Sequence, residues 1–126
     1  MKKQQRPVFL NPLKIAFPAS AKVSILHRFS GLLLFLAIPV GLALLQRSLS
    51  SADALNRLAD IAGYGVALKS LLLIVLVGTA YHFCAGIRFL LLDMHVGVAL
   101  GQARRSAKLV LAAGVVAFLV FGFLLW

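Results

Sequence analysis

The chain has 126 residues, of which 62% are hydrophobic, and its formal net charge at pH 7 is +10. A soluble domain is nearer roughly 45–50% apolar, so this composition excludes an ordinary soluble domain and predicts an all-α membrane protein with three spans. The basic residues lie outside the apolar runs, without a basic–aromatic motif, so nucleic acid is not expected as a partner. The single cysteine, Cys84, excludes an internal disulfide and a cysteine-only metal site.

Residues 1–21 are predicted to be a cytoplasmic surface segment. Their basic start is followed by a polar stretch in which Pro12 and Pro18 oppose a continuous helix. A helix is expected from about Ala19. No pattern of a cleavable signal or an import peptide is evident, so we expect a multi-pass protein of a bacterial inner membrane.

The membrane domain is expected to cover residues 22–126, with its first span at about 22–45. Pro39 within this span predicts a kink in the preceding turn. The first turns are unusually polar, and four residues at helical spacing form one stripe: Ser24, His27, Arg28 and Gly31. A polar connection follows, in which Ser51 is a candidate start of a short surface helix.

The second span is expected at about 63–92 and the third at about 109–126. Between them, Met94 to Lys108 is predicted to be a loop carrying Arg104, Arg105 and Lys108. The lead-in and this loop are richer in lysine and arginine than the connection between the first two spans. The positive-inside rule therefore predicts a cytoplasmic N-terminus and a periplasmic C-terminus.

The second span contains a histidine between two glycines. On a helix, Gly78, His82 and Gly86 share one face, with a glycine one turn to either side of the imidazole. A flat haem ligated by His82 needs that clearance, and iron in haem takes axial ligands of this kind. The alternative is a small-residue packing face with His82 hydrogen-bonded to a neighbouring helix.

The topology brings the polar ends of the first two spans to the same side of the membrane. Counting about 1.5 Å per residue places His82 roughly 15 Å, and His27 roughly 7 Å, inside the membrane. This offset argues against His27 as a second axial ligand. His27 and Arg28 offer the positive charge and hydrogen bonds that haem propionates need, and the alternative for His27 is an interfacial hydrogen-bonding residue. The serine and arginine of the stripe, Ser24 and Arg28, can donate to a quinone oxygen. The alternative is a packing serine and an ordinary positive-inside arginine.

Two motifs in this order resemble the signatures of the cytochrome b subunit of succinate dehydrogenase. The first is Arg6-Pro7 followed by Ser24-x-x-His27-Arg28-x-Ser30-Gly31; the second is His82-x-x-x-Gly86-Ile87-Arg88, with Asp93 following. The resemblance covers nearly the whole chain. Many members carry a second histidine where this chain has Phe89.

The resemblance implies half of a two-subunit membrane anchor of respiratory complex II. It implies haem b shared with the second anchor subunit, which supplies the other haem histidine, and a haem-iron ligand at His82. It also implies a ubiquinone-reduction site at Ser24 and Arg28. The expected partners are an iron–sulfur subunit, a flavoprotein and membrane lipid. Succinate is oxidised in the soluble subunits, so this chain carries no catalytic residue for that step.

Three alternatives remain open at this stage. One is the anchor of a related fumarate reductase, which differs in the physiological direction of the reaction. Another is a haem-free structural anchor in which His82 only joins helices. The third is a transporter component in which Arg88 and Asp93 line a polar path.

Overall fold

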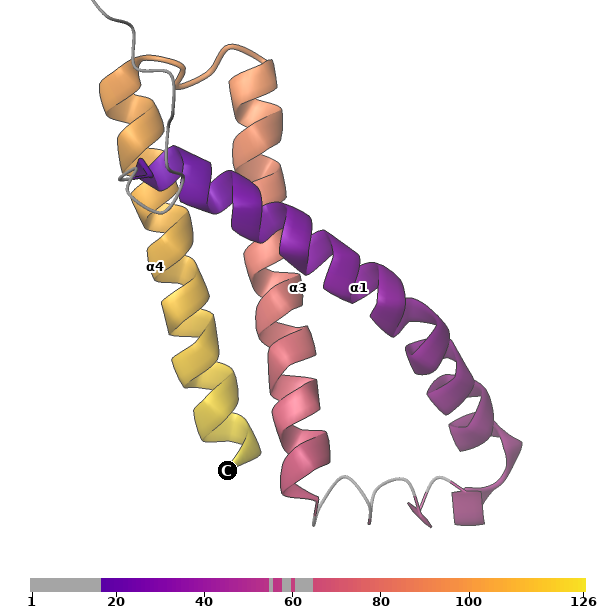
Figure 1. Cartoon of the computed structure of the whole chain (residues 1–126). Coiled ribbons are helices and arrows are strands. Elements are labelled where there is room, and N and C mark those ends of the chain that lie inside the picture. The colour runs from indigo at the N-terminus through magenta and orange to yellow at the C-terminus, as the bar shows by residue number, and fades with distance from the viewer. Residues whose placement is uncertain (1–16, 55, 58–59, 61–64) are drawn as a thin grey trace, which may run out of the picture.

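The computed structural model describes residues 17–54, 56–57, 60 and 65–126. This part of the chain forms three helices, α1 (Ala19–Ser50), α3 (Val66–Asp93) and α4 (Leu100–Leu125). Figure 1 shows α3 and α4 as an antiparallel pair and α1 crossing α3 diagonally, with its N-terminal turns against α4. The predicted surface segment 1–16, which includes Arg6 and Pro7, and the expected start of the second span at 63 lie outside the described residues.

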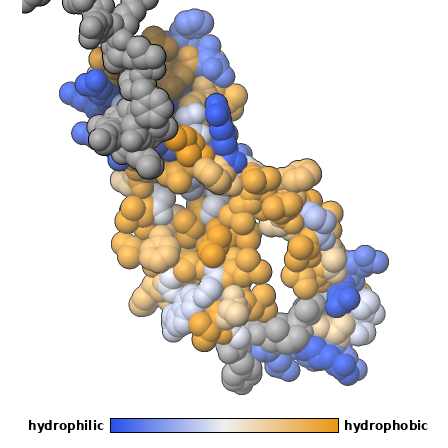
Figure 2. Space-filling view, viewed as in Figure 1, coloured by the Kyte–Doolittle hydropathy of each residue, from blue (hydrophilic) through white to orange (hydrophobic). Residues whose placement is uncertain are grey.

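All three helices are long and apolar enough to cross a bilayer. Their outward faces are apolar, and Figure 2 shows a broad hydrophobic belt with hydrophilic residues gathered towards the two ends of the molecule. No strand occurs among the described residues. The predicted all-α membrane fold with three spans is confirmed.

The helix boundaries differ from the expected spans mainly between the second and third helices. The prediction of a loop from 94 to 108 is wrong for its second half, because α4 already begins at Leu100. Residues 101–108 contain no proline and several good helix formers, so the helix extends beyond its apolar run. Hydropathy indicates where a membrane begins, whereas backbone hydrogen bonding decides where a helix begins.

The turn between α3 and α4 closes on a histidine in a left-handed conformation. The amide of His95 donates to the carbonyl of Leu92, and the amide of Val96 donates to that of Leu91. This is the hydrogen-bond pattern of a Schellman motif, in which glycine usually occupies the position held here by His95, with φ of 62°. The motif ends α3 directly after Asp93 and turns the chain into α4 within a few residues.

The connection that follows α1 includes the short helical segment expected after Ser51. Residues 52–54 are helical, and the amide of Ala54 donates to Ser51 Oγ over 3.0 Å. A serine hydroxyl that accepts from the first turn is an N-cap, which explains the start of helix at this point.

The buried core lies at the end of the bundle where α1 meets both other helices. It consists of Val23, Tyr81, Ala85, Ala107 and Val110. The hydroxyl of Tyr81 donates to the carbonyl of Val23 over 3.1 Å and so joins α3 to α1. Small residues on α4 and the long reach of this tyrosine allow the three helices to converge here.

Arg88 is also buried at this end, with 5% of its surface exposed. Its Nε donates to Ser106 Oγ over 3.0 Å and its Nη2 to the carbonyl of Ala103 over 3.2 Å, both on α4. Its guanidinium also lies 5.3 Å from the ring centre of Phe89. A guanidinium held in this way is costly to move, so Arg88 joins α3 to α4, whereas Asp93 is exposed.

Candidate functional site

Two histidines from different helices lie in contact where α1 crosses α3. The imidazoles of His27 and His82 are stacked, with ring centres 4.0 Å apart and planes 11° from parallel. Phe89 of α3 adds a tilted ring whose centre lies 5.2 Å from that of His27. The structure therefore brings the candidate haem histidines of the two motifs into contact.

The hydrogen bonds of His82 determine which ring nitrogen is available. Its Nδ1 lies 3.0 Å from Ser30 Oγ and 3.2 Å from the carbonyl oxygen of His27. A carbonyl can only accept, and the Ser30 hydroxyl already donates to the same carbonyl over 2.9 Å. These contacts favour the tautomer with the proton on Nδ1, which leaves the lone pair on Nε2.

The expected depth offset between His27 and His82 is wrong. Counted from the observed helix ends, His27 is eight residues from Ala19 and His82 is eleven from Asp93. Three residues of difference correspond to about 4.5 Å along a helix. Figure 1 shows that α1 begins below the turn between α3 and α4, and this lower start accounts for the rest. The argument against His27 as a second ligand that rested on depth therefore no longer holds.

A glycine on α1 explains why the two helices approach so closely at the histidines. A Cβ on Gly31 would lie 3.1 Å from Cε1 of His82, so no larger residue fits without displacing the imidazole. A Cβ on Gly86 would lie 3.7 Å from Nε2 of His27, an ordinary contact distance. The other glycine flanking His82, Gly78, faces Leu33 of α1 at 3.0 Å. In this chain, the glycine face around His82 thus accommodates α1.

The Nε2 atom of His27 is buried without a hydrogen-bond partner among the described residues. A buried polar nitrogen of this kind costs free energy unless a partner satisfies it, so it indicates a group that the chain alone does not supply. No group of three or more metal-binding side chains occurs in the described ranges. That finding is compatible with haem, which takes one axial side chain from a subunit.

The candidate quinone residues lie on the flank of α1 next to the histidines. Ser24 is half-buried and Arg28 is exposed, four residues apart on the same helix. A shallow hollow of about 300 Å³ adjoins Arg28 and is lined by α1 residues alone: Ile25, Arg28, Phe29 and Leu32. An enclosed quinone site here would need walls from other subunits.

Ser30 and Gly31 are the site residues whose roles sequence reasoning missed. Both belong to the first motif. No contact was expected for Ser30, and Gly31 was assigned only to the polar stripe. Ser30 lies three residues after His27, on the same helix face, and that spacing was the available signal. Its partner His82 lies fifty-two residues away, so only the packing of the helices reveals the hydrogen bond.

Fold and site together define a three-helix membrane protein with a polar, histidine-containing junction between its first two membrane helices. The chain matches the model of the succinate dehydrogenase/fumarate reductase transmembrane subunit family over residues 2–121. It is also 34% identical over 122 residues to the succinate dehydrogenase cytochrome b556 subunit of Coxiella burnetii, covering 97% of this chain and 98% of the relative. The chain belongs to the succinate dehydrogenase/fumarate reductase transmembrane subunit family.

Proposed function

We propose that the chain is the cytochrome b anchor of a bacterial succinate:quinone oxidoreductase, sharing haem b with a second anchor subunit and helping to form the ubiquinone-reduction site. It is catalytic only as part of that complex, which also contains an iron–sulfur subunit and a flavoprotein. The observation that supports this best is the His82 imidazole, whose Nδ1–H is engaged by Ser30 and His27. Metal-binding histidines commonly donate their second ring N–H to a carbonyl or similar acceptor, which fixes the tautomer.

The residues present fit a haem. His82 would hold the iron through Nε2, and His27 and Arg28 would meet the propionates, since His27 has a buried nitrogen in need of a partner and Arg28 carries a permanent charge. When bound, haem b supplies one-electron redox chemistry. Gly86 lets the His27 ring approach α3, since a Cβ there would already lie 3.7 Å from Nε2 of His27.

For the quinone, the proposed residues act by binding and orientation. The Ser24 hydroxyl and the Arg28 guanidinium donate hydrogen bonds to a carbonyl oxygen, and the arginine stabilises negative charge that develops there during reduction. Reduction to the quinol takes two electrons and two protons. We place this site at the cytoplasmic side of the inner membrane, where the iron–sulfur subunit would cover the open hollow beside Arg28.

The haem assignment is tested with the purified complex carrying His82→Ala. We expect loss of the reduced b-type absorption spectrum, because the axial nitrogen is removed. His95→Ala is the matched control, since His95 is exposed and lies in the turn between α3 and α4. An unchanged spectrum in the His82 variant would exclude this residue as a required ligand.

The quinone assignment is tested by comparing two assays of the same complex. Arg28→Leu should lower quinone reduction by about 100-fold while succinate oxidation with a soluble artificial acceptor persists, because a donor to the reacting oxygen is lost. Arg47→Leu is the control, as it removes an exposed arginine near the other end of α1. An equal loss in both assays for Arg28→Leu would argue against a quinone role.

A haem-free structural anchor is the second candidate, and the same hydrogen bond supports it. His82 joins α3 to α1 whether or not its other nitrogen binds iron. Copurified haem separates the two functions: a complex that assembles with no haem would favour the structural anchor. A fumarate reductase anchor would share both sites, and the relative rates of succinate oxidation and fumarate reduction distinguish it.

A further inference from the structure

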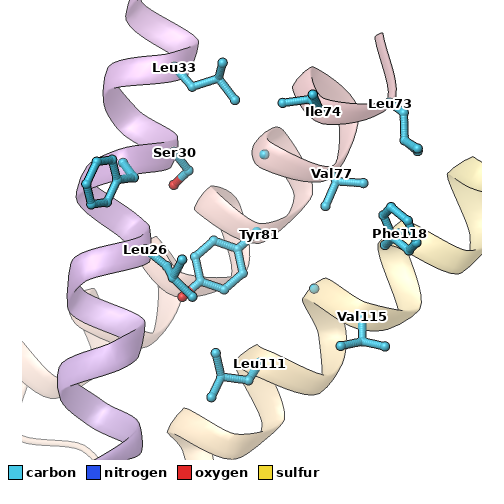
Figure 3. A pocket seen from close by; sticks show the side chains of 13 residues that line it. Leu26, Ser30, Leu33, Leu73, Ile74, Val77, Tyr81, Leu111, Val115 and Phe118 are labelled. Carbon is cyan, nitrogen blue, oxygen red and sulfur yellow. The ribbon is translucent and has the colours of Figure 1, made fainter. Parts of the chain in front are cut away.

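A groove of about 710 Å³ runs between α1 and α4, with α3 as its floor. Figure 3 shows Leu26 and Leu33 on α1, Val77 on α3, and Leu111 and Phe118 on α4 pointing into the space. Neither His27 nor His82 lines it, and the groove meets the imidazole pair only through Ser30, the hydrogen-bond partner of His82. Its lining is almost wholly apolar, which suits a hydrocarbon occupant.

The lining is unlike a docking site for another transmembrane helix. Helices in membranes pack through small residues that allow close backbone approach. The two glycines of the groove, Gly78 and Gly114, are already covered, since Cβ atoms there would lie 3.0 Å from Leu33 and 3.0 Å from Tyr81 of this same chain. What remains open is a surface of branched and aromatic side chains, to which a flexible chain can conform.

Each wall of the groove carries a basic residue at the end nearest the buried core. On α1, Lys22 lies four residues before Leu26 and so shares its face. On α4, Lys108 lies three residues before Leu111 on the face that lines the groove. Both lysines are exposed, and each is next in sequence to a core residue, Val23 or Ala107. The two lysines therefore lie on the groove-lining faces of α1 and α4, each one turn before a lining residue.

The dimensions match one leaflet of a bilayer. From Leu26 to Leu33, α1 extends about 10 Å along its own axis, and Lys22 lies about 6 Å before Leu26 on that axis. The apolar stretch thus falls within the hydrocarbon half-thickness of about 15 Å, with the lysines towards the headgroup region. A phospholipid is arranged in the same way, with its anionic phosphate in the headgroup region and its acyl chain in the hydrocarbon.

We propose that this groove binds one acyl chain of an anionic phospholipid whose phosphate is held by Lys22 and Lys108. Charge attraction selects anionic lipid at the headgroup, and apolar contact with α1, α3 and α4 retains the chain. The bound chain fills the wedge that opens where α1 diverges from α4 and so supports the crossing that brings His27 onto His82.

The test uses native mass spectrometry of the assembled complex after delipidation in detergent. Dioleoyl phosphatidylglycerol or dioleoyl phosphatidylcholine is added at matched concentrations. We expect the wild-type complex to retain the anionic lipid several-fold more than the zwitterionic one. Lys22→Gln with Lys108→Gln should lower the retention of the anionic lipid by about tenfold, because two charge contacts are lost.

The matched control is Arg47→Gln with Arg57→Gln, which removes two exposed positive charges elsewhere and should leave retention unchanged. Val115→Phe, which adds bulk to the groove wall, should reduce retention of both lipids. Equal retention of the two lipids by the wild type, or equal behaviour of the two double variants, would overturn the proposal. So would a photoreactive residue at position 115 that crosslinks to another subunit rather than to lipid.

Discussion

The two halves of α1 meet very different surroundings. Its first half contains Val23 and Ser30, which are 0% and 7% exposed, whereas every residue from 38 to 47 is exposed. The interhelical side-chain hydrogen bonds of Tyr81, His82 and Arg88 all join α3 to its neighbours at the first, convergent end. At the other end, α1 and α3 diverge around an apolar space of about 310 Å³.

This contrast separates the end of the bundle that the chain holds together by its own hydrogen bonds from the end that depends on lipid or other subunits. Side-chain hydrogen bonds are strong but need partners at defined positions. At the convergent end, the chain supplies most of these partners itself. Apolar surfaces need only lipid or another subunit, and the divergent end presents such surfaces. The candidate haem and quinone residues lie at the convergent end, where the helices are held most firmly.

The largest effect is expected for Arg88→Met. The substitution removes two charge-assisted hydrogen bonds to α4, each worth roughly 1.5–3 kcal/mol, so the free energy of unfolding should fall by about 3–6 kcal/mol. The thermal midpoint and yield of the assembled complex measure the loss. Arg47→Met at the divergent end should change stability by less than about 0.5 kcal/mol. Equal losses would contradict the contrast between the two ends.

A second comparison is between substitutions at two glycines of α4, Gly114 and Gly122. Alanine favours a helix by up to about 1 kcal/mol over glycine at both sites. At Gly114 the new Cβ would lie 3.0 Å from the Tyr81 ring, whereas nothing lies within 4 Å at Gly122. Gly114→Ala should therefore be less stable than Gly122→Ala by about 1–3 kcal/mol, the usual cost of overpacking. Thermal unfolding of the two purified variants measures the difference. Identical midpoints would show that the Tyr81 ring moves aside without a cost in stability.

The smallest effect is expected for Ser30→Ala. It removes one of two acceptors of the His82 Nδ1–H and leaves the carbonyl of His27 in place, so about 1 kcal/mol should be lost. Because this hydrogen bond would tune the basicity of Nε2 in a ligating histidine, the haem proposed at His82 should show a shifted midpoint potential with its spectrum retained. Ser48→Ala, whose hydroxyl bonds only within α1, is the control. An unchanged potential would mean that Ser30 serves packing alone.

Much of the site was predictable because its signals are local. The glycine spacing around His82 and the polar stripe of α1 follow from helical periodicity, which any three or four consecutive turns reveal. The predicted places of His82 and of the stripe on helices are confirmed. The roles of Ser24, His27, Arg28 and His82 in binding quinone and haem stay predictions, as does the orientation in the membrane.

By itself, the sequence determined the class of protein, the number of membrane helices and which residues share a face, because hydropathy and helical periodicity depend on neighbours along the chain. Only the tertiary structure decided that α1 crosses α3 at the histidines, that Arg88 turns to α4, and that a groove opens between α1 and α4. The reason is that a crossing depends on contacts between distant residues, such as Gly31 with His82 and Gly114 with Tyr81. Residue counts along single helices cannot reveal which side chains will meet across them.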